Sequence, residues 1–244
     1  MREGVPAEYD WLEEDVEDHG FMASATRPGP YHRRNEDVAL LSATASGWPV
    51  LIVCDGVGSN PLAAEAARDA ADAVADHLAE IGQPRLSDLA AAVLSGHRAA
   101  NETGGERQPA GETTIALAVV SPGAVLVGNV GDSRIYAGTG AWMQQVSVDH
   151  ATGPYTLTQC LGGGAPDPVP HLRKVELPDG GFVLVCSDGL SNCLWGGERE
   201  PRLRASSPAE ICAALIRRAD ERGATDDATL AVGTVPARPS PRVP

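Results

Sequence analysis

The chain contains 244 residues, which is enough for one large domain or two small ones. Hydrophobic residues make up 43% of the chain but aromatic residues only 4%, so its core has to be built mainly from Ala, Val, Leu and Ile. The formal net charge of -14 argues against nucleic acid or anionic membranes as partners, and it favours multivalent cations wherever carboxylates cluster.

Composition along the chain predicts three regions. Residues 1–20 are acidic and weakly periodic, which indicates an irregular N-terminal arm. Residues 21–235 form one continuous domain without internal repeats. The Pro-rich segment 236–244 is predicted to be a disordered tail.

Short apolar runs predict strands, and longer stretches that follow N-cap signals predict helices. The predicted strands are 21–25, 38–42, 49–54, 113–120, 124–130, 134–138, 142–146, 174–177, 182–186 and 228–234. The predicted helices are 61–81 after the N-cap Asn60, a run that Ser87 caps and that continues to about residue 101, and 208–222, which opens on the capping box of Ser207 and Glu210. Several strands are separated only by turn residues, so they must pair antiparallel. Together these elements predict an α+β fold with two packed antiparallel sheets flanked by helices.

The five cysteines form no Cys-x-x-Cys pair; they are Cys54, Cys160, Cys186, Cys193 and Cys212. We interpret them as buried thiols in a reducing compartment rather than as a zinc site. The first twenty residues lack the apolar core of a signal peptide, and no apolar run approaches the length of a membrane span. We therefore expect a cytoplasmic protein with no membrane partner.

Five acidic motifs lie at predicted strand ends or in turns. They are Asn35-Glu36-Asp37, Asp55-Gly56-Val57-Gly58, Gly131-Asp132-Ser133-Arg134, Ser187-Asp188-Gly189 and Thr225-Asp226-Asp227. One Asp-Gly pair is usually an ordinary turn, so the argument depends on their recurrence. A carboxylate at the end of a buried strand is held rigidly, and a following Gly allows a sharp turn that brings its carbonyl near a ligand. Converging carboxylates need a cation between them, and hard oxygen ligands suit Mg²⁺ or Mn²⁺.

In their order, these motifs resemble those of the metal-dependent protein phosphatases, the PPM or type 2C family, in its bacterial form. The resemblance extends from residue 35 to residue 229. The matching segments are 35–37, 53–58, 113–114, 130–136, 149–150, 157–162, 186–191 and 225–229. Each segment alone is a weak signal, but the ordered set is specific. The resemblance implies a sandwich of two antiparallel sheets flanked by helices, in agreement with the predicted elements.

The resemblance also implies roles for individual residues. Asp55 is expected to bridge two metal ions, and Gly56 is expected to offer its carbonyl oxygen to one of them. Asp188 and Asp226 are expected to complete the shell of the other ion.

Further ligands follow from the same resemblance. Asp37, together with Glu36, is expected to hold metal-bound waters. Asp132 corresponds to the residue that helps to bind a third ion in some relatives. The implied cofactors are therefore two Mn²⁺ or Mg²⁺ ions, with a third as an option.

The implied activity is that of a serine/threonine phosphoprotein phosphatase. A hydroxide held between the two ions would attack phosphorus in line, so no covalent phosphoenzyme is needed. We prefer this mechanism to a covalent serine mechanism, because no His partner marks Ser133 or Ser187 as a nucleophile. The implied partners are a phosphorylated protein and a cognate Ser/Thr kinase. No basic stripe with interleaved aromatic residues indicates nucleic-acid binding.

The sequence departs from the family pattern where substrate phosphate would bind. The family usually has Arg at the position of His32, and His cannot offer a bidentate guanidinium. The candidates for phosphate binding are therefore His32 itself and the two arginines that follow, Arg33 and Arg34; weak phosphate binding is the remaining option.

Three further departures are substitutions, and one is a deletion. Glu112 replaces a Gly before Thr113, Ser59 replaces a Gly, and Asp227 replaces an Asn. We expect Glu112 to perturb a tight turn, and Asp227 to tighten metal binding or to weaken anion binding through its charge. Residues 151–156 are too few for the helical flap that bacterial relatives insert there. The flap is therefore predicted to be largely missing and the active site to be more open.

Two alternatives to an active phosphoprotein phosphatase stay open. The first is a catalytically weak regulatory module that binds metal or a phosphoprotein, motivated by His32 and Glu112. The second keeps the chemistry but changes the substrate to a small phosphomonoester, because the missing flap would expose the site.

Overall fold

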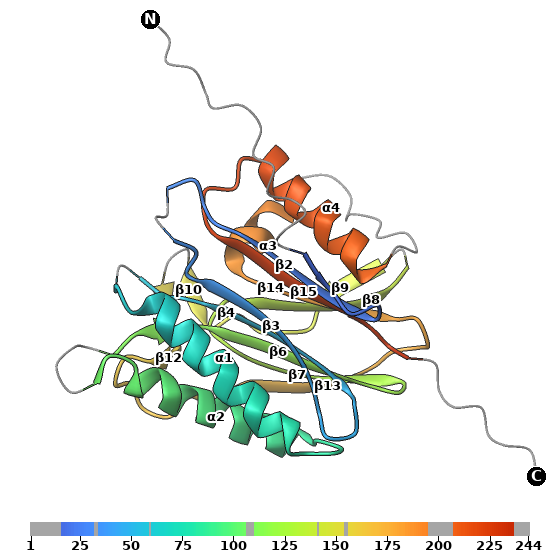
Figure 1. Cartoon of the computed structure of the whole chain (residues 1–244), viewed down its shortest axis with the longest axis horizontal. Helices are drawn as coiled ribbons and strands as arrows, with labels where there is room; N and C mark the ends of the chain where they lie inside the picture. The colour runs from blue at the N-terminus through green and yellow to red at the C-terminus, as the bar shows by residue number, and fades with distance from the viewer. Residues whose placement is uncertain are drawn as a thin grey trace, which may run out of the picture.

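The chain folds into four layers in the order helices, sheet, sheet, helices (Figure 1). The computed structural model describes residues 16–31, 34–58, 60–105, 110–140, 142–153, 156–194 and 207–236. The six-stranded sheet contains, in spatial order, β1 (Val16–Asp18), β2 (Met22–Arg27), β15 (Ala228–Thr234), β14 (Phe182–Cys186), β8 (Arg134–Thr139) and β9 (Trp142–Gln145). The five-stranded sheet contains β13 (His171–Glu176), β7 (Ala124–Val130), β6 (Ile115–Ser121), β4 (Pro49–Asp55) and β3 (Asp37–Ala43). The strands of both sheets pair antiparallel, so the predicted fold class is confirmed.

Each sheet has its own pair of helices on its outer face. Helices α1 (Ala63–Ala79) and α2 (Leu86–Glu102) cover the five-stranded sheet, and α3 (Asp188–Leu194) and α4 (Pro208–Glu221) cover the six-stranded sheet (Figure 1). Small side chains let α1 and α2 approach closely. A Cβ atom added to Gly96 of α2 would lie only 2.9 Å from the Val74 side chain of α1.

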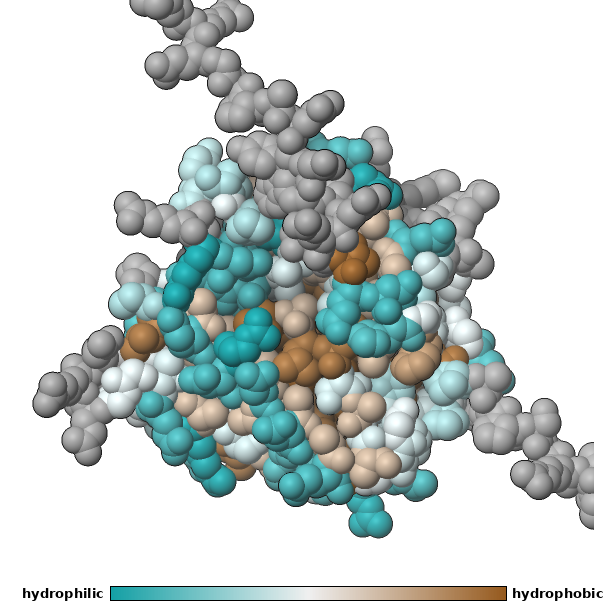
Figure 2. All heavy atoms as spheres, viewed as in Figure 1, coloured by the Kyte–Doolittle hydropathy of each residue, from teal (hydrophilic) through white to brown (hydrophobic). Residues whose placement is uncertain are grey.

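Successive side chains of a strand point to opposite faces of its sheet, and this alternation divides the core into three apolar layers. In β4, Ile52 and Cys54 face the α1 and α2 helices, whereas Leu51 and Val53 face the other sheet. In β14, Leu184 and Cys186 face α4. Figure 2 shows many hydrophilic side chains over α1 and α2 and a group of hydrophobic ones near the middle of this face.

Helix starts test the predicted caps. The capping box at α4 is confirmed: the Ser207 hydroxyl accepts the Glu210 N–H, and the Glu210 carboxylate accepts the Ser207 N–H. The cap predicted at Ser87 is wrong, because α2 begins at Leu86 and Asp88 caps the helix by accepting the Arg85 N–H at 2.7 Å. The cap predicted at Asn60 is also wrong, because α1 begins at Ala63 with Leu62 as its N-cap residue. The Asn60 side chain instead accepts the Leu62 N–H at 3.0 Å, in the turn before the helix.

The segment 151–157, which was predicted to be too short for a helical flap, contains a small hairpin. Strands β10 (Ala151–Gly153) and β11 (Thr156–Leu157) pair with each other, and the described part of this connection contains no helix. A second small pair joins β5 (Glu112–Thr113) to β12 (Leu161–Gly162). Among the described residues, no helix is both long enough and apolar enough to cross a membrane.

Two parts of the predicted organisation stay untested. Residues 1–15 of the predicted arm and 237–244 of the predicted tail lie outside the described residues. Strand β1, which lies within the predicted arm, pairs with β2.

Candidate metal-binding active site

The five acidic motifs meet at one end of the two sheets. Asp37 begins β3 and is the register partner of Asp55, which ends β4. Asp188 begins α3, one residue after β14, and Asp226 lies two residues before β15, the partner of β14. The antiparallel order thus brings strand starts and strand ends to the same edge.

These residues line one cavity of about 310 Å³. Its walls contain Glu36, Asp55, Gly56, Val57, Gly58, Thr114, Asp132, Leu157, Asp188 and Asp226. All six predicted metal-binding residues except Asp37 are therefore brought together as lining residues. Asp37 lies behind them and is only 7% exposed.

The carboxylates raise one another's pKa values. Burial, followed by the charges of Asp37 and Asp188, holds the pKa of Asp55 well above its ordinary value. Burial and then Asp132 and Asp226 raise the pKa of Asp188 to about 6. Several acidic groups that resist ionisation together in a cavity are a candidate functional site, and a cation would relieve their repulsion.

Asp37 provides a second observation that fits a bound cation or water. Burial raises its pKa to about 7, against hydrogen bonds from Ser187 and Thr229 that lower it. Its Oδ2 atom is buried and has no hydrogen-bond partner. Buried polar atoms are normally paired, so this atom is suited to a water or ion that the protein chain itself does not supply.

The donor set therefore fits hard divalent cations, although the side chains are not closed around one. No group of three His, Cys, Asp or Glu side chains in the described part of the chain has the geometry to enclose an ion. Carboxylate and carbonyl oxygens are the ligands that Mg²⁺ and Mn²⁺ prefer. Asp55, Asp188 and Asp226 would hold such ions together with the Gly56 carbonyl.

Gly56 is required by close packing. A Cβ atom at this position would lie 2.8 Å from the backbone of Ala63 and 2.9 Å from the Glu36 carbonyl oxygen. The Gly56 N–H donates to that same carbonyl at 3.2 Å. A side chain would thus push apart the two segments that place the Gly56 carbonyl beside Asp55.

Hydroxyl groups hold Asp55 in place, and the sequence did not indicate this role. Thr114 accepts the Asp55 N–H through its Oγ1 atom at 3.1 Å and donates its own N–H to the Asp55 carbonyl at 2.8 Å. Its hydroxyl also bonds the Ser133 hydroxyl at 2.7 Å, in the turn that carries Asp132. The Thr113-Thr114 motif was visible in the sequence, but its function as a support for Asp55 was not.

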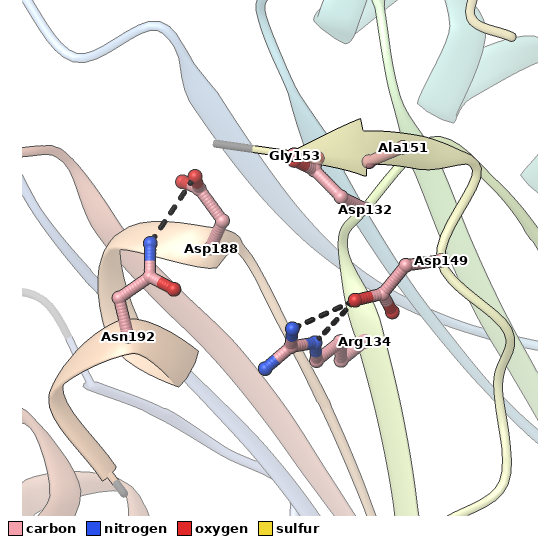
Figure 3. Close-up of a pocket in the computed structure, with 7 residues that line it drawn as sticks. All are labelled: Asp132, Arg134, Asp149, Ala151, Gly153, Asp188 and Asn192. Carbon is pink, nitrogen blue, oxygen red and sulfur yellow. Dashed lines mark hydrogen bonds and ion pairs between the residues drawn. The ribbon is translucent and has the colours of Figure 1, made fainter. Parts of the chain in front are cut away.

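A second cavity, of about 570 Å³, adjoins the first and shares Asp132 and Asp188 with it (Figure 3). Arg134 on its wall donates to Asp149 Oδ2 from Nε at 2.9 Å and from Nη2 at 2.7 Å. Asn192 of α3 lies next to Asp188 and donates to it at 3.4 Å. Ala151 and Gly153 of β10 complete the rim of this cavity. The small β10–β11 hairpin therefore takes the place of the helical flap that the sequence is too short to contain.

The phosphate-binding candidates are only partly located. His32 and Arg33 lie outside the described residues. Arg34 is exposed, forms a two-pronged ion pair with Glu65, and donates to the Pro61 carbonyl at 2.8 Å. Its guanidinium is therefore engaged by the start of α1 and is not part of either cavity wall.

The structure contradicts the expectation for Glu112, whereas the expected effect of Asp227 on ion binding stays a prediction. Glu112 extends β5, where its carbonyl accepts the Val57 N–H at 2.9 Å and its side chain lies against Gly163, so it perturbs no turn. Asp227 is 2% exposed and accepts backbone N–H groups rather than facing the cavity.

The cysteines and serines near the site carry no sign of a nucleophile. Burial raises the thiol pKa of both Cys54 and Cys186. Ser133 and Ser187 are fully buried, and their hydroxyls bond Thr114 and the Thr229 backbone.

Comparisons with known proteins agree with this architecture. The family model described as Protein phosphatase 2C matches residues 29–229. The serine/threonine phosphatase of S. agalactiae has a TM-score of 0.75 at 22% identity, covering 88% of this chain and 98% of that chain. The Mycobacterium tuberculosis serine/threonine phosphatase PstP/Ppp has a TM-score of 0.74 at 22% identity, with the same coverage of 88% and 98%. Stp1 from Staphylococcus aureus has a TM-score of 0.74 at 19% identity, covering 95% and 99%. At these identities the structural likeness shows the fold; no curated protein matches the sequence significantly.

Proposed function

Because this chain belongs to the protein phosphatase 2C family, we propose that it is a Mn²⁺- or Mg²⁺-dependent serine/threonine phosphoprotein phosphatase. The observation that carries the proposal is the single cavity lined by Asp55, Asp188 and Asp226, whose carboxylates crowd one another. Bound divalent ions would supply the hydroxide nucleophile and neutralise phosphoryl charge. A full set of buried hard ligands is costly to maintain unless an ion is bound.

The protein residues have distinct tasks in this proposal. Asp55, Asp188, Asp226 and the Gly56 carbonyl would hold the two ions, and Asp132 would help to hold a third. Glu36 on the cavity wall, together with the buried Asp37, would orient metal-bound water. The cavity opens beside the β10–β11 hairpin, so a phosphorylated side chain can enter from that side; the partners are a phosphoprotein and the kinase that phosphorylates it.

One observation keeps a second function in consideration. Arg34, the described candidate for phosphate binding, is bound to Glu65 instead of lining the cavity. A regulatory module that binds metal or a phosphoprotein but turns over slowly would have the same carboxylates. A phosphatase for a small phosphomonoester is the third candidate, since no described helix covers the cavity next to β10.

Phosphate release tests the proposal and separates the three candidates. The substrates are a phosphothreonine peptide and a generic aryl phosphate, each with Mn²⁺ or with EDTA, for the wild type and for Asp188→Asn. The proposal predicts Mn²⁺-dependent release from the peptide that the substitution abolishes. Release from the aryl phosphate alone would favour the small substrate, and bound metal without release from either would favour the regulatory module.

A further inference from the structure

Asp227 is a buried carboxylate that the proposed chemistry does not use. It is 2% exposed and does not line either of the two cavities, although its neighbour Asp226 does. The resemblance to the phosphatase family leads one to expect Asn here. The extra carboxylate therefore needs an explanation from its surroundings.

Both oxygens of Asp227 accept a backbone N–H from a distant segment. Oδ1 accepts the Gly29 N–H at 2.6 Å, and Oδ2 accepts the Glu36 N–H at 2.7 Å. The Asp227 N–H donates to Asp226 Oδ1 at 2.9 Å. One residue thus contacts a predicted ligand directly and also holds both ends of the segment 29–36.

Glu36 extends this connection to the opposite side of the cavity. While its N–H donates to Asp227, its carbonyl accepts the Gly56 N–H at 3.2 Å. Asp227 is therefore linked through one peptide residue to Gly56, which is expected to offer a carbonyl to a metal ion, and to its neighbour Asp55.

The third ligand-bearing segment packs directly on Asp227. A Cβ atom added to Gly189 would lie 2.0 Å from the Asp227 carbonyl oxygen. The first turn of α3, which begins at Asp188, is therefore in close backbone contact with Asp227. The segments around Asp226, Gly56 and Asp188 all meet at this one residue.

We propose that Asp227 is a positioning residue that fixes the spacing of these three segments and so sets the geometry of the metal-binding cavity. The inference rests on the proposed function, because it takes the three segments to be metal ligands. The role needs a carboxylate, since two N–H groups approach two different oxygens. A carboxamide has one acceptor oxygen, and its NH₂ group would face one of the two donors.

A different effect of the extra carboxylate has to be separated from positioning. A negative charge near the cavity would attract cations even if it held nothing in place. If Asp227 acts only through its charge, removal of that charge weakens metal binding but leaves the backbone unchanged. If Asp227 acts by positioning, its loss also exposes the Glu36 N–H to hydrogen exchange.

Calorimetric titration with Mn²⁺, combined with amide hydrogen exchange, tests the proposal. Asp227→Asn is compared with the wild type and with Asp76→Asn, which removes the same charge from an exposed site on α1. We expect Mn²⁺ affinity to fall about 10- to 100-fold in Asp227→Asn, with faster exchange at Glu36. Asp76→Asn is expected to match the wild type in both measurements.

Three outcomes would overturn the proposal. They are wild-type affinity and exchange in Asp227→Asn, weaker binding with unchanged exchange at Glu36, and, in the metal-free wild type, a Glu36 amide that exchanges as fast as an unstructured peptide. The last measurement needs no variant, so it applies even if Asp227→Asn does not fold. Absence of Mn²⁺ binding to the wild type would instead count against the proposed function.

Discussion

Thr114 connects Asp55 to the turn that carries Asp132. Its hydroxyl accepts the Asp55 N–H and bonds Ser133, while its backbone N–H donates to the Asp55 carbonyl. The residue is 1% exposed, so water cannot replace a lost partner. Such supporting groups would set the position of Asp55 as a metal ligand without touching the ion.

Thr114→Val should therefore weaken both the site and the fold. Valine has a similar shape but leaves the Asp55 N–H and the Ser133 hydroxyl without their partner. We expect kcat on a phosphothreonine peptide to fall by about 10-fold and the unfolding free energy to fall by about 1–3 kcal/mol. Steady-state kinetics and urea denaturation measure the two effects.

Thr114→Ser is the matched control, because it keeps the hydroxyl and removes only a methyl group. It should stay near wild-type activity. Equal activity in Thr114→Val and Thr114→Ser would show that the hydroxyl does not support Asp55.

Among single residues, the sequence predicted the positions of the cavity carboxylates well, but it did not predict which residues hold those carboxylates in place. Asp55, Asp188 and Asp226 could be predicted because each lies in a short motif at a strand boundary. The role of Asp227 could not, because Gly29 and Glu36 lie 198 and 191 residues away from it in the chain. Charge suggested an influence on ion binding, whereas the structure shows a pair of backbone contacts.

Helix α4 covers the six-stranded sheet, and its first turn is fixed by the capping box of Ser207 and Glu210. Ile211, Cys212 and Leu215 on its inner face join the core cluster that contains Leu184 of β14. Because β14 leads directly to Asp188, the packing of α4 supports one wall of the cavity.

Ser207→Ala should destabilise the protein through this helix. The hydroxyl that accepts the Glu210 N–H is lost, and N-cap replacements of this kind cost about 1 kcal/mol. Urea denaturation measures the change, with Ser207→Asp as a control that keeps a capping acceptor. The same stability for Ser207→Ala and Ser207→Asp would contradict a contribution from the cap.

The bounds of strands with a continuous apolar run were predictable from the sequence, whereas those of short or atypically capped helices were not. Strands β7, β14 and β15 were predicted with the bounds that the structure has. Helix α3 was missed because it has only seven residues and contains Gly189 in its first turn. The start of α2 was misplaced because the side chain that caps the helix is that of Asp88, which accepts the Arg85 N–H, and not that of Ser87.

The whole molecule buries several carboxylates at the edge where its two sheets meet. In the metal-free protein, burial raises the pKa of Asp37 to about 7 and that of Asp188 to about 6. The unfolded chain has ordinary Asp values near 3.9. The folded state thus binds these protons more tightly, so their contribution to stability is present at low pH and is lost as the pH rises through about 4 to about 7.

Asp37→Asn should reveal this contribution. Burial lowers the pKa values of His150 and His171, so these two groups favour the fold at higher pH and oppose the carboxylates. Comparison of two proteins that share these histidines removes their effect. In EDTA, the unfolding free energy of Asp37→Asn should fall less between pH 5.5 and pH 7.5 than that of the wild type. Denaturation at the two pH values measures the difference, and the same pH dependence in both proteins would contradict the raised pKa of Asp37.

The most direct test of the central claim is a Mn²⁺ titration of the wild type and of Asp55→Asn, with heat of binding and phosphate release recorded on the same samples. If Asp55 bridges the ions of a catalytic centre, the wild type will bind two ions per chain and release phosphate only when they are bound. Asp55→Asn will lose tight binding and turnover together. Phosphate release by the wild type in EDTA, or wild-type binding and turnover in Asp55→Asn, would contradict a metal-dependent phosphatase built on this cavity.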